Sequence, residues 1–398
     1  CYEGLEVKWS SGVVFRGEIY KDTSPYYGKG VYAYESSLGI VDSFIHQRAY
    51  WTYTDGIYAD KSSLLAENVT IKGFDGAIYI GNSENNQILN STIVKEGVVY
   101  FSGISNSLIY NCTFSDGAYI YMSGCDHNQI RNCSLDGTSW NGIYLSGSDN
   151  NTISSNEVRN FKTGIYLQNS DDNVISDNTI EENDCGIYIR EYTYYTIYES
   201  ENNSLYGNVI RNNEFGLKID YSEDTLMRGN VFSDNKYNFG VKGSKPSHYI
   251  HDIDTSNTID GKPMYYIVDQ SGVTIDSSAN AGYVAIVSSE NVNVKDLSIG
   301  NSRQCFLVAY SRDCSLDNVT AFNFSIAGID IESSENVSIG CEAYGAGSFS
   351  YAAGVRLYNS THCSMECYLH DNWKKRWTCG AYIEKSDCNT IEGEFVNN

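Results

Sequence analysis

The chain has 398 residues, a net charge of −23 at pH 7, 41% apolar residues and twelve cysteines. The charge argues against a nucleic-acid partner, because phosphate binding needs a basic surface. No run of 18 apolar residues occurs, which argues against a membrane span. Proline occurs only three times, and the chain has 34 tyrosines but only 14 phenylalanines. We therefore expect regular strands around a large core, with an acidic surface.

Residues 1–56 contain no clean repeat and are crowded with Tyr and Trp, as in SPYYGKGVYAY. We expect them to form an irregular first turn that caps one end of the fold. The chain begins at Cys1 without a methionine or a signal-peptide pattern. We interpret this as a processed chain whose targeting segment has been removed.

From residue 57 to 242 the sequence repeats at an interval of about 22 residues. GIYLSGSDNNTI begins at Gly142, and GIYLQNSDDNVI begins at Gly164. In each unit, apolar and polar residues alternate over a few positions, and a cluster of Gly, Asn, Asp or Ser follows, as in a strand and a turn. One aliphatic residue follows each polar turn at the same interval, namely Ile88, Ile109, Ile130, Ile153 and Ile175.

Short strands with this period can bury their inward faces only by stacking as coils. The pattern predicts an all-β fold, a right-handed parallel β-helix (solenoid) with coils of about 21–26 residues. Residues 243–282 interrupt the rhythm and hold Pro246 and Pro263. Since alternation returns at once, we interpret them as an irregular insertion within the solenoid, followed by a second β-helix segment over 283–398.

The GIYL…NNTI units and the segment NTIDGKPMYYIVDQSGVTI resemble NosD-type proteins and the wider CASH group of carbohydrate-binding proteins and sugar hydrolases, which are frequent on archaeal cell surfaces. The resemblance implies the β-helix fold from about residue 60 onward. The group includes surface proteins, polysaccharide enzymes and a copper-enzyme maturation factor, so the fold leaves the function open.

One tyrosine in each repeat is expected to face outward. In GIYL, Ile143 and Leu145 share the inward face of a strand, so Tyr144 points away from the core. We predict an external ladder with one ring per coil, which ends at Lys218. Such a ladder would stabilise the sheet, form an assembly face for another protein, or hold sugar rings. Its members are Tyr58, Tyr79, Tyr100, Tyr121, Tyr144, Tyr166 and Tyr188.

The cysteines indicate an oxidising, extracellular compartment, because none lies in a C-x-x-C pattern typical of zinc or redox sites. Pairs at one register of adjacent coils predict disulfides, namely Cys112 with Cys133 and Cys341 with Cys367. Cys363 and Cys388, in adjacent turns one coil apart, form a third predicted pair. The others have no partner from register and would be buried thiols or cross-links between subunits: Cys1, Cys125, Cys185, Cys305, Cys314 and Cys379.

Ten N-x-[ST] sequons permit surface glycosylation in that compartment. A chain so rich in Asn, Ser and Thr also produces about that many by chance. The sequons begin at Asn68, Asn90, Asn111, Asn132, Asn150, Asn202, Asn318, Asn323, Asn336 and Asn359.

A glycosidase would need two carboxyl groups about 5–9.5 Å apart, and acids at one register of adjacent coils could supply them. The candidates in turns are Asp149, Asp171, Asp172 and Asp184. Those on or beside outward strand positions are Asp220, Asp330 and Glu332, with Arg356 one coil beyond Asp330. A solvated acidic surface accounts for the same residues, and we assign no catalytic residue.

Metal sites are not expected either. His248 and His251 lie three residues apart in the irregular segment, but no Cys or third His accompanies them. The supply of His and Met is also poor for the copper role that a NosD resemblance would imply. The G-G-x-G-x-D repeat that binds calcium is missing. We expect no cofactor.

Two classes of function fit this sequence. The first is an extracellular, cell-surface protein that assembles with copies of itself into a layer, sheath or filament, or acts as an adhesin. The chain ends at IEGEFVNN in the middle of a repeat unit, which would offer an open coil to another copy. The alternative is a polysaccharide lyase or hydrolase, or a module that binds cell-surface glycans. We favour the first, and so expect a homo-oligomer and no enzyme.

Overall fold

The computed structural model describes residues 4–21, 28–47, 54–95, 97–191, 200–347, 352–373 and 378–398. The described strands are short, and nearly all of them pair in parallel with strands one coil away. This confirms the predicted parallel β-helix. The chain forms two compact units, Cys1–Asn208 and Val209–Asn398. None of the helices in the described ranges is long and apolar enough to cross a membrane.

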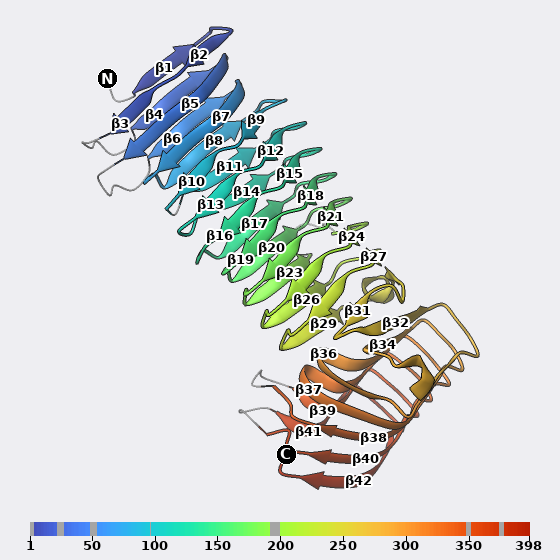
Figure 1. Ribbon diagram of the computed structural model, residues 1–398. Helices are drawn as coiled ribbons and strands as arrows, with labels where there is room; N and C mark the ends of the chain where they lie inside the picture. Colours follow the sequence, from blue (N-terminus) through green and yellow to red (C-terminus); the bar gives the residue numbers. More distant parts are fainter. Residues whose placement is uncertain are drawn as a thin grey trace. The chain divides into compact units, whose positions relative to one another are not determined.

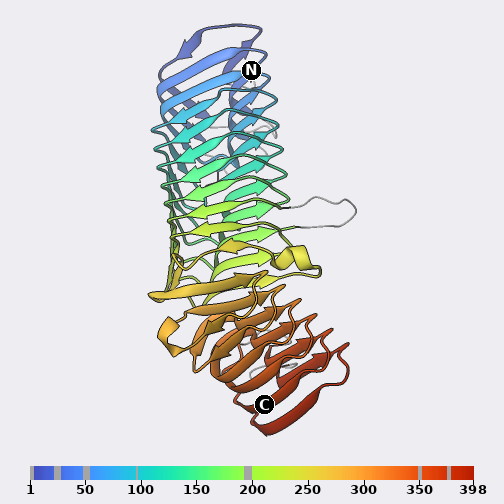
Figure 2. The same ribbon diagram turned by 90° about the vertical axis from the view of Figure 1, so that its right-hand side faces the viewer.

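In the first unit, each coil adds one strand to the sheet that carries the tyrosines (Figures 1 and 2). This sheet is made of β1 (Leu5–Lys8), β4 (Lys29–Tyr34), β6 (Asp55–Asp60), β8 (Gly76–Gly81), β11 (Val98–Ser102), β14 (Tyr119–Ser123), β17 (Asn141–Ser146), β20 (Thr163–Gln168) and β23 (Cys185–Arg190).

Two further columns of strands complete each coil of this unit. The first column holds β2 (Val13–Phe15), β9 (Gln87–Leu89), β12 (Leu108–Tyr110), β15 (Gln129–Arg131), β18 (Thr152–Ser154), β21 (Val174–Ser176) and β24 (Ser204–Tyr206). The second column holds β3 (Glu18–Lys21), β10 (Thr92–Val94), β13 (Thr113–Ser115), β16 (Ser134–Asp136), β19 (Glu157–Arg159) and β22 (Thr179–Glu181). The long strands β5 (Ser37–Gln47) and β7 (Ser63–Lys72) run through both columns.

The second unit contains the following elements, of which η1 and η2 are short 3-10 helices: β25 (Val209–Arg211), β26 (Phe215–Asp220), β27 (Leu226–Arg228), β28 (Val231–Ser233), β29 (Tyr237–Lys242), η1 (Pro246–Tyr249), β30 (Asp252–Ile253), β31 (Thr258–Ile259), β32 (Lys262–Val268), β33 (Thr274–Ile275), η2 (Ser277–Ala279), β34 (Tyr283–Val287), β35 (Asn293–Lys295), β36 (Ser298–Ala309), β37 (Ser315–Glu332), β38 (Ser338–Tyr344), β39 (Ala353–Tyr358), β40 (Ser364–His370), β41 (Cys379–Glu384) and β42 (Thr390–Val396). The segment expected to be irregular holds both 3-10 helices and an antiparallel pair, β31 with β32. One outer face of the unit follows the ladder β34, β36, β37, β39 and β41.

The segment expected to be an irregular cap, residues 1–56, contains regular coils in its described part. Strand β4 pairs with β6 in register, with Tyr32 level with Tyr58. The interval between these tyrosines is 26 residues, whereas the later members of the ladder recur at 21 to 23. The coil between Tyr32 and Tyr58 is therefore longer than the later ones, and the period of about 22 residues does not reveal it.

The apolar alternation buries one row of side chains from each strand. Ile143 and Leu145 of β17 are fully buried, while Tyr144 between them is half-buried and faces outward. The glycine before them is required by close packing, because a Cβ on Gly142 would lie 2.8 Å from the carbonyl oxygen of Gly164 in the next coil. The repeated GIYL sequence thus encodes one outward ring, two inward aliphatic side chains and one close backbone approach.

Buried asparagines connect the coils at their turns. Asn173 accepts a hydrogen bond at Oδ1 from the backbone N–H of Asn151 over 2.9 Å, and its Nδ2 donates to the carbonyl of Ser148 over 3.0 Å. Asn203 repeats this arrangement one coil further on. Turn backbone groups that the strands leave unpaired are satisfied in this way inside the core, where an unmade hydrogen bond costs most.

We expect the substitution Asn173→Ala to lower the free energy of unfolding by about 2–3 kcal/mol, because it leaves a buried N–H and a buried carbonyl unpaired. Urea unfolding followed by circular dichroism measures this loss. The control is Ser154→Ala on the outer face of β18, which should change stability by less than about 0.5 kcal/mol. Equal effects of the two substitutions would contradict the role given to the buried amides.

Candidate functional site

The seven predicted ladder tyrosines stack on one sheet of the first unit. Neighbouring ring centroids lie 4.5–5.6 Å apart along the series. The planes of Tyr121, Tyr144 and Tyr166 are nearly parallel, whereas Tyr79 and Tyr100 meet edge to face at 71°. Burial and the neighbouring Tyr79 raise the pKa of Tyr58 to about 12.

This stacking limits what the ladder can bind. Sugar rings pack on the open faces of aromatic side chains, but in most of the stack each face is covered by the next tyrosine. The outer surface therefore offers ring edges and hydroxyl groups, and the hydroxyl of Tyr144 already donates to Gln168 over 2.9 Å. The ladder stabilises the sheet, and the assembly or binding role that we predicted for it stays a prediction.

The predicted disulfides do not form in the structure, in which every described cysteine is a free thiol. Cys341 and Cys367 do pair in register, yet their Sγ atoms lie 2.8 Å apart, beyond the S–S bond length of about 2.05 Å. The strand spacing of about 4.8 Å lies within the Cα separation that a disulfide allows, so a bond between these two thiols under oxidising conditions stays a prediction.

Cys112 and Cys133 stack because they occupy a turn position of the amide column. The backbone N–H of Cys133 donates to the side chain of Asn156, which holds the equivalent position in the next coil. Both thiols lie within 3.3 Å of a backbone carbonyl oxygen, that of Tyr110 or Arg131. The shared register therefore indicated a small inward side chain rather than a bond.

The cysteines of the third predicted pair, Cys363 and Cys388, are offset by one residue in the register between their coils. Cys363 lies level with Asn389, to which its backbone N–H donates over 2.8 Å, and it is buried, whereas Cys388 is exposed. Of the cysteines without an expected partner, Cys1 lies outside the described residues. Cys379 is half-buried and the rest are buried, namely Cys125, Cys185, Cys305 and Cys314.

All ten sequon asparagines have a left-handed backbone, with φ between 49° and 57°. Asn tolerates this conformation better than most residues, so each turn selects it without reference to glycosylation. The Ser or Thr two positions later falls at or near the start of the next strand, as Thr113 does after Asn111. The turn geometry accounts for the sequons, and their occupancy stays a prediction.

The turn aspartates of the first unit are structural. The carboxylate of Asp149 accepts the backbone N–H of Asp171 over 2.8 Å, and the carboxylate of Asp171 accepts that of Glu201 over 2.8 Å. Asp172 adopts the left-handed backbone with φ 55°, and Asp184 lies in a turn. Two of the predicted turn candidates, Asp149 and Asp171, thus cap the next coil.

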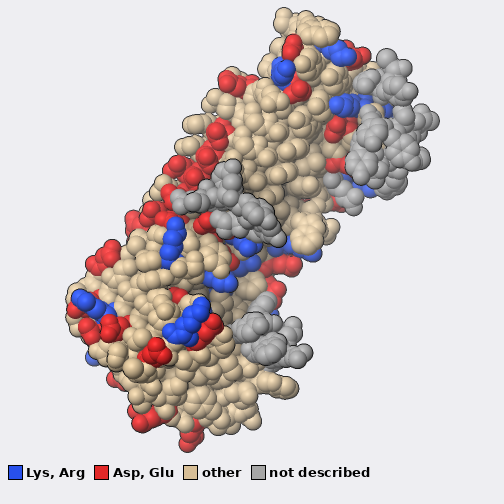
Figure 3. Space-filling view, turned by 180° about the vertical axis from the view of Figure 1, so that it is seen from behind, with Lys and Arg blue, Asp and Glu red and all other residues tan. Residues whose placement is uncertain are grey.

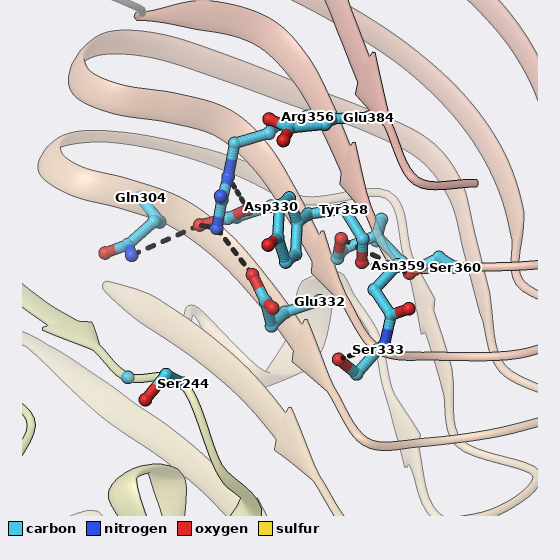
Figure 4. Close-up of polar contacts among 12 residues, drawn as sticks. Ser244, Gln304, Asp330, Glu332, Ser333, Arg356, Tyr358, Asn359, Ser360 and Glu384 are labelled. Carbon is cyan, nitrogen blue, oxygen red and sulfur yellow. Dashed lines mark hydrogen bonds and ion pairs between the residues drawn. The ribbon is translucent and has the colours of Figure 1, made fainter.

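Three of the outward strand candidates of the second unit, Asp330, Glu332 and Arg356, in contrast, come together (Figure 4). Asp330 and Glu332 project from the same face of β37, and Arg356 on β39 is level with Asp330. The guanidinium of Arg356 binds Asp330 through contacts of 2.6 and 3.1 Å and binds Glu332 through one contact of 2.9 Å. One arginine therefore serves two buried carboxylates.

Two residues that the sequence did not single out extend this cluster. Gln304 on β36 donates to Asp330 over 3.3 Å and to the carbonyl of Val241 over 2.6 Å. Arg303 binds Asp220 over 2.6 Å, across 83 residues of sequence. The repeat period of the sequence could relate Arg356 to Asp330. It could not predict contacts between residues on opposite sides of the irregular segment.

The electrostatics of Glu332 are unusual. Burial and, to a lesser degree, the charge of Asp330 raise its pKa to about 7, and Arg356 offsets only part of that rise. Two carboxylates on one guanidinium compete for the same positive charge, so one of them is easily protonated. A titratable side chain with such a pKa beside a cleft indicates a functional site.

An open cleft of about 490 Å³ lies beside this cluster, within the second unit. Its lining includes aromatic rings from three strands, Phe215, Tyr358 and Tyr382, and the amide of Gln304. Four of its lining side chains are cationic and two are carboxylates, namely Lys218, Lys242, Arg303 and Arg356 with Asp220 and Glu384. A second hollow of about 570 Å³ is lined by Asp317, Glu342, Glu366 and Glu394 and by no Lys or Arg.

The two histidines of the irregular segment do not form a metal site. The Nδ1 atoms of both accept backbone N–H groups, His248 from Ser244 and His251 from Thr225. Burial lowers the pKa of His251 to about 3. Among the residues that the structure describes, no three His, Cys, Asp or Glu side chains are grouped to hold a metal ion.

We expect Glu332→Gln to stabilise the protein increasingly as the pH rises. The fold favours protonated Glu332, so its contribution is complete below about pH 4.5 and is lost as the pH rises through about 7. The variant should gain up to about 3 kcal/mol over the natural protein between pH 5 and pH 8. Thermal unfolding at a series of pH values measures the difference, with exposed Glu335→Gln as the control. A constant difference would contradict the raised pKa.

We expect Tyr144→Leu to lower the free energy of unfolding by about 1–3 kcal/mol, because it removes two ring contacts and a hydrogen bond. Tyr110→Leu, a change at an exposed tyrosine outside the ladder, is the control. The stabilities of both variants can be compared by urea unfolding. If Tyr144→Leu left stability unchanged, the stacking would be incidental.

Three comparisons place the chain among known proteins. A search of curated proteins finds no match. Solved structures similar to this chain include the periplasmic alginate epimerase AlgG, with 11% identity, a TM-score of 0.37 and coverage of 96% of this chain and 78% of that one. They also include endopolygalacturonase I from Stereum purpureum, with 10% identity, a TM-score of 0.38 and coverage of 97% and 96%. The tailspike protein of E. coli bacteriophage HK620 has 11% identity, a TM-score of 0.39 and coverage of 97% and 73%.

The sequence of the chain also matches a family model, described as periplasmic copper-binding protein (NosD), over residues 15–199 and 195–266. These residues include the tyrosine ladder, the amide columns of the first unit and the first part of the irregular segment. Because the match covers more than half of its length, the chain belongs to the NosD family.

Proposed function

We propose that the protein is an exported β-helix protein that binds a polysaccharide in the cleft of its second unit. The observation that carries this proposal is the lining of that cleft, where Tyr358 and Tyr382 lie beside the guanidinium of Arg356. Aromatic rings support the apolar faces of sugars, and charged planar groups bind their hydroxyl and carboxyl groups. An open cleft with few convergent polar groups is the usual form of a binding site.

The burial of the acidic cluster favours binding without cleavage. A general acid or base must come within hydrogen-bond reach of the atom that it serves. Asp330 is 0% exposed and is held by Arg356 and Gln304, and Glu332 is 4% exposed. We therefore retain the expectation that the protein is not an enzyme, as part of the proposal.

The family description names copper, and the described residues do not fit such a site. Copper in proteins is held by imidazole, thiolate or thioether groups that converge on one point. His248 and His251 use Nδ1 in backbone contacts, and no third ligand is grouped with them. We derive no copper chemistry for this chain.

The site of action and the assembly state are further parts of the hypothesis. The family is described as periplasmic, which supports a protein that works outside the cytoplasm. A location at the cell surface and assembly with copies of itself both stay predictions. Analytical ultracentrifugation of the purified chain over a range of concentrations tests the assembly.

We expect the double substitution Tyr358→Ala and Tyr382→Ala to weaken polysaccharide binding at least tenfold, because it removes two rings from the cleft. Binding to a panel of soluble polysaccharides is measured by calorimetry, and the reaction mixtures are checked for released oligosaccharides. Trp140→Ala is the control, since Trp140 is a highly exposed ring in the first unit. Loss of binding in the control alone would contradict the proposed cleft, and product release would contradict binding without cleavage.

A further inference from the structure

We propose that the bound polysaccharide is carboxylated, and that a uronate carboxylate binds Arg356 in exchange for Glu332, which takes up a proton. This inference rests on the proposed function and names the ligand class for the same cleft. It follows from the charge of the cleft, from the contacts that its arginines make, and from the position of Glu332.

The cleft gathers cationic side chains on an acidic protein, although Asp330 and Glu332 behind its lining offset part of the charge of Arg356. The chain carries 50 acidic and 27 basic residues, and Asp and Glu side chains run along one edge of the face drawn in Figure 3. Yet four Lys or Arg side chains and only two carboxylates line this cleft. Neutral sugars need no cations, whereas a polyanion is attracted by a local excess of positive charge and repelled by the rest of the surface.

The arginines of the cleft are already arranged for carboxylate groups. Arg303 binds the carboxylate of Asp220, and Arg356 binds that of Asp330 through two nitrogens. The planar guanidinium fork matches a planar carboxylate in two parallel hydrogen bonds. These contacts favour a uronate over a sulfate ester as the ligand group.

Glu332 is the contact that a ligand can replace. It binds Arg356 through one contact of 2.9 Å, whereas Asp330 has two. Arg356 lines the cleft, and its side chain is 22% exposed, so its guanidinium can be reached from solvent. An incoming carboxylate that takes the place of Glu332 would leave that side chain without its cation.

A proton compensates for the lost cation. Glu332 faces Asp330 on its own strand, Arg356 and Tyr358 on β39, Tyr310 after β36 and Tyr249 on η1. Among these groups, Arg356 is the cation that opposes the charge of Asp330. Since burial already raises the pKa of Glu332 to about 7, a proton from solvent neutralises it at little cost. One carboxylate enters, one proton is taken up, and the net charge of the site is unchanged.

The test is calorimetric titration of the full chain at pH 6, 7 and 8. Its ligands are oligogalacturonate or alginate oligomers, dextran sulfate and the neutral glucan laminarin. Carboxylated oligomers should bind at least tenfold more tightly than laminarin, and about tenfold more tightly at pH 6 than at pH 8. At pH 7, buffers of different ionisation enthalpy should reveal an uptake of roughly half a proton.

Two variants test the proton exchange at Glu332 and the contribution of the cleft cations separately. Glu332→Gln should bind carboxylated oligomers without pH dependence and without proton uptake. Lys242→Ala, a change at an exposed residue of the cleft, should weaken the binding of carboxylated oligomers more than it weakens the binding of laminarin. The natural protein provides the reference for both.

Each other outcome has a distinct meaning. Equal affinity for laminarin and oligogalacturonate, with binding still lost in the Tyr358→Ala and Tyr382→Ala variant, overturns this inference and keeps the proposed function. Equal affinity for dextran sulfate assigns the site to anions in general and overturns the carboxylate. Binding that persists without proton uptake overturns the exchange at Glu332. Absence of binding by any glycan overturns both proposals.

Discussion

The hydrogen bonds between successive coils are the interaction on which the rest of this chain depends. A coil of about 22 residues has too little apolar surface to be stable alone, and each of its strands is paired by strands of the neighbouring coils. The turns contain further backbone N–H and C=O groups that strand pairing leaves without hydrogen-bond partners. The buried amides of Asn151, Asn173 and Asn203 satisfy them. Because all these groups must be satisfied together, the register from coil to coil is fixed, and every outward side chain has a determined neighbour.

This fixed register turns sequence periodicity into rows of side chains. Where a row repeats one residue type, it becomes a structural ladder, as with Tyr121, Tyr144 and Tyr166. Where a row mixes charges, it brings opposite partners together at strand spacing, as with Asp330 and Arg356. The same constraint therefore produces an aromatic stack in one unit and a charged cluster in the other. What differs is the residue at the outward position.

The sequence predicted those features that register alone determines. The period revealed the coils, and the alternation in GIYL placed Tyr144 outside the core. The position of Cys341 opposite Cys367 was also correct, and the two thiols lie in contact without a disulfide between them. The asparagine sequons were visible, yet their left-handed backbone explains them without glycans.

Contacts that cross the irregular segment could not be predicted in this way. Arg303 meets Asp220 only because residues 243–282 return the chain to the cleft, and no periodic rule describes that path.

The consequence for the site is physical. Within a regular stack, a carboxylate has neighbours of its own kind at the same register, and the columns of turn aspartates remain solvated caps. At the cleft, strands from different parts of the chain meet, and burial makes Glu332 compete with Asp330 for Arg356. An ion pair with more anions than cations costs stability where it is buried. Such a cost is retained most readily where a ligand can relieve it, and for that reason the interruption of the repeat, rather than the repeat itself, is where we place the function.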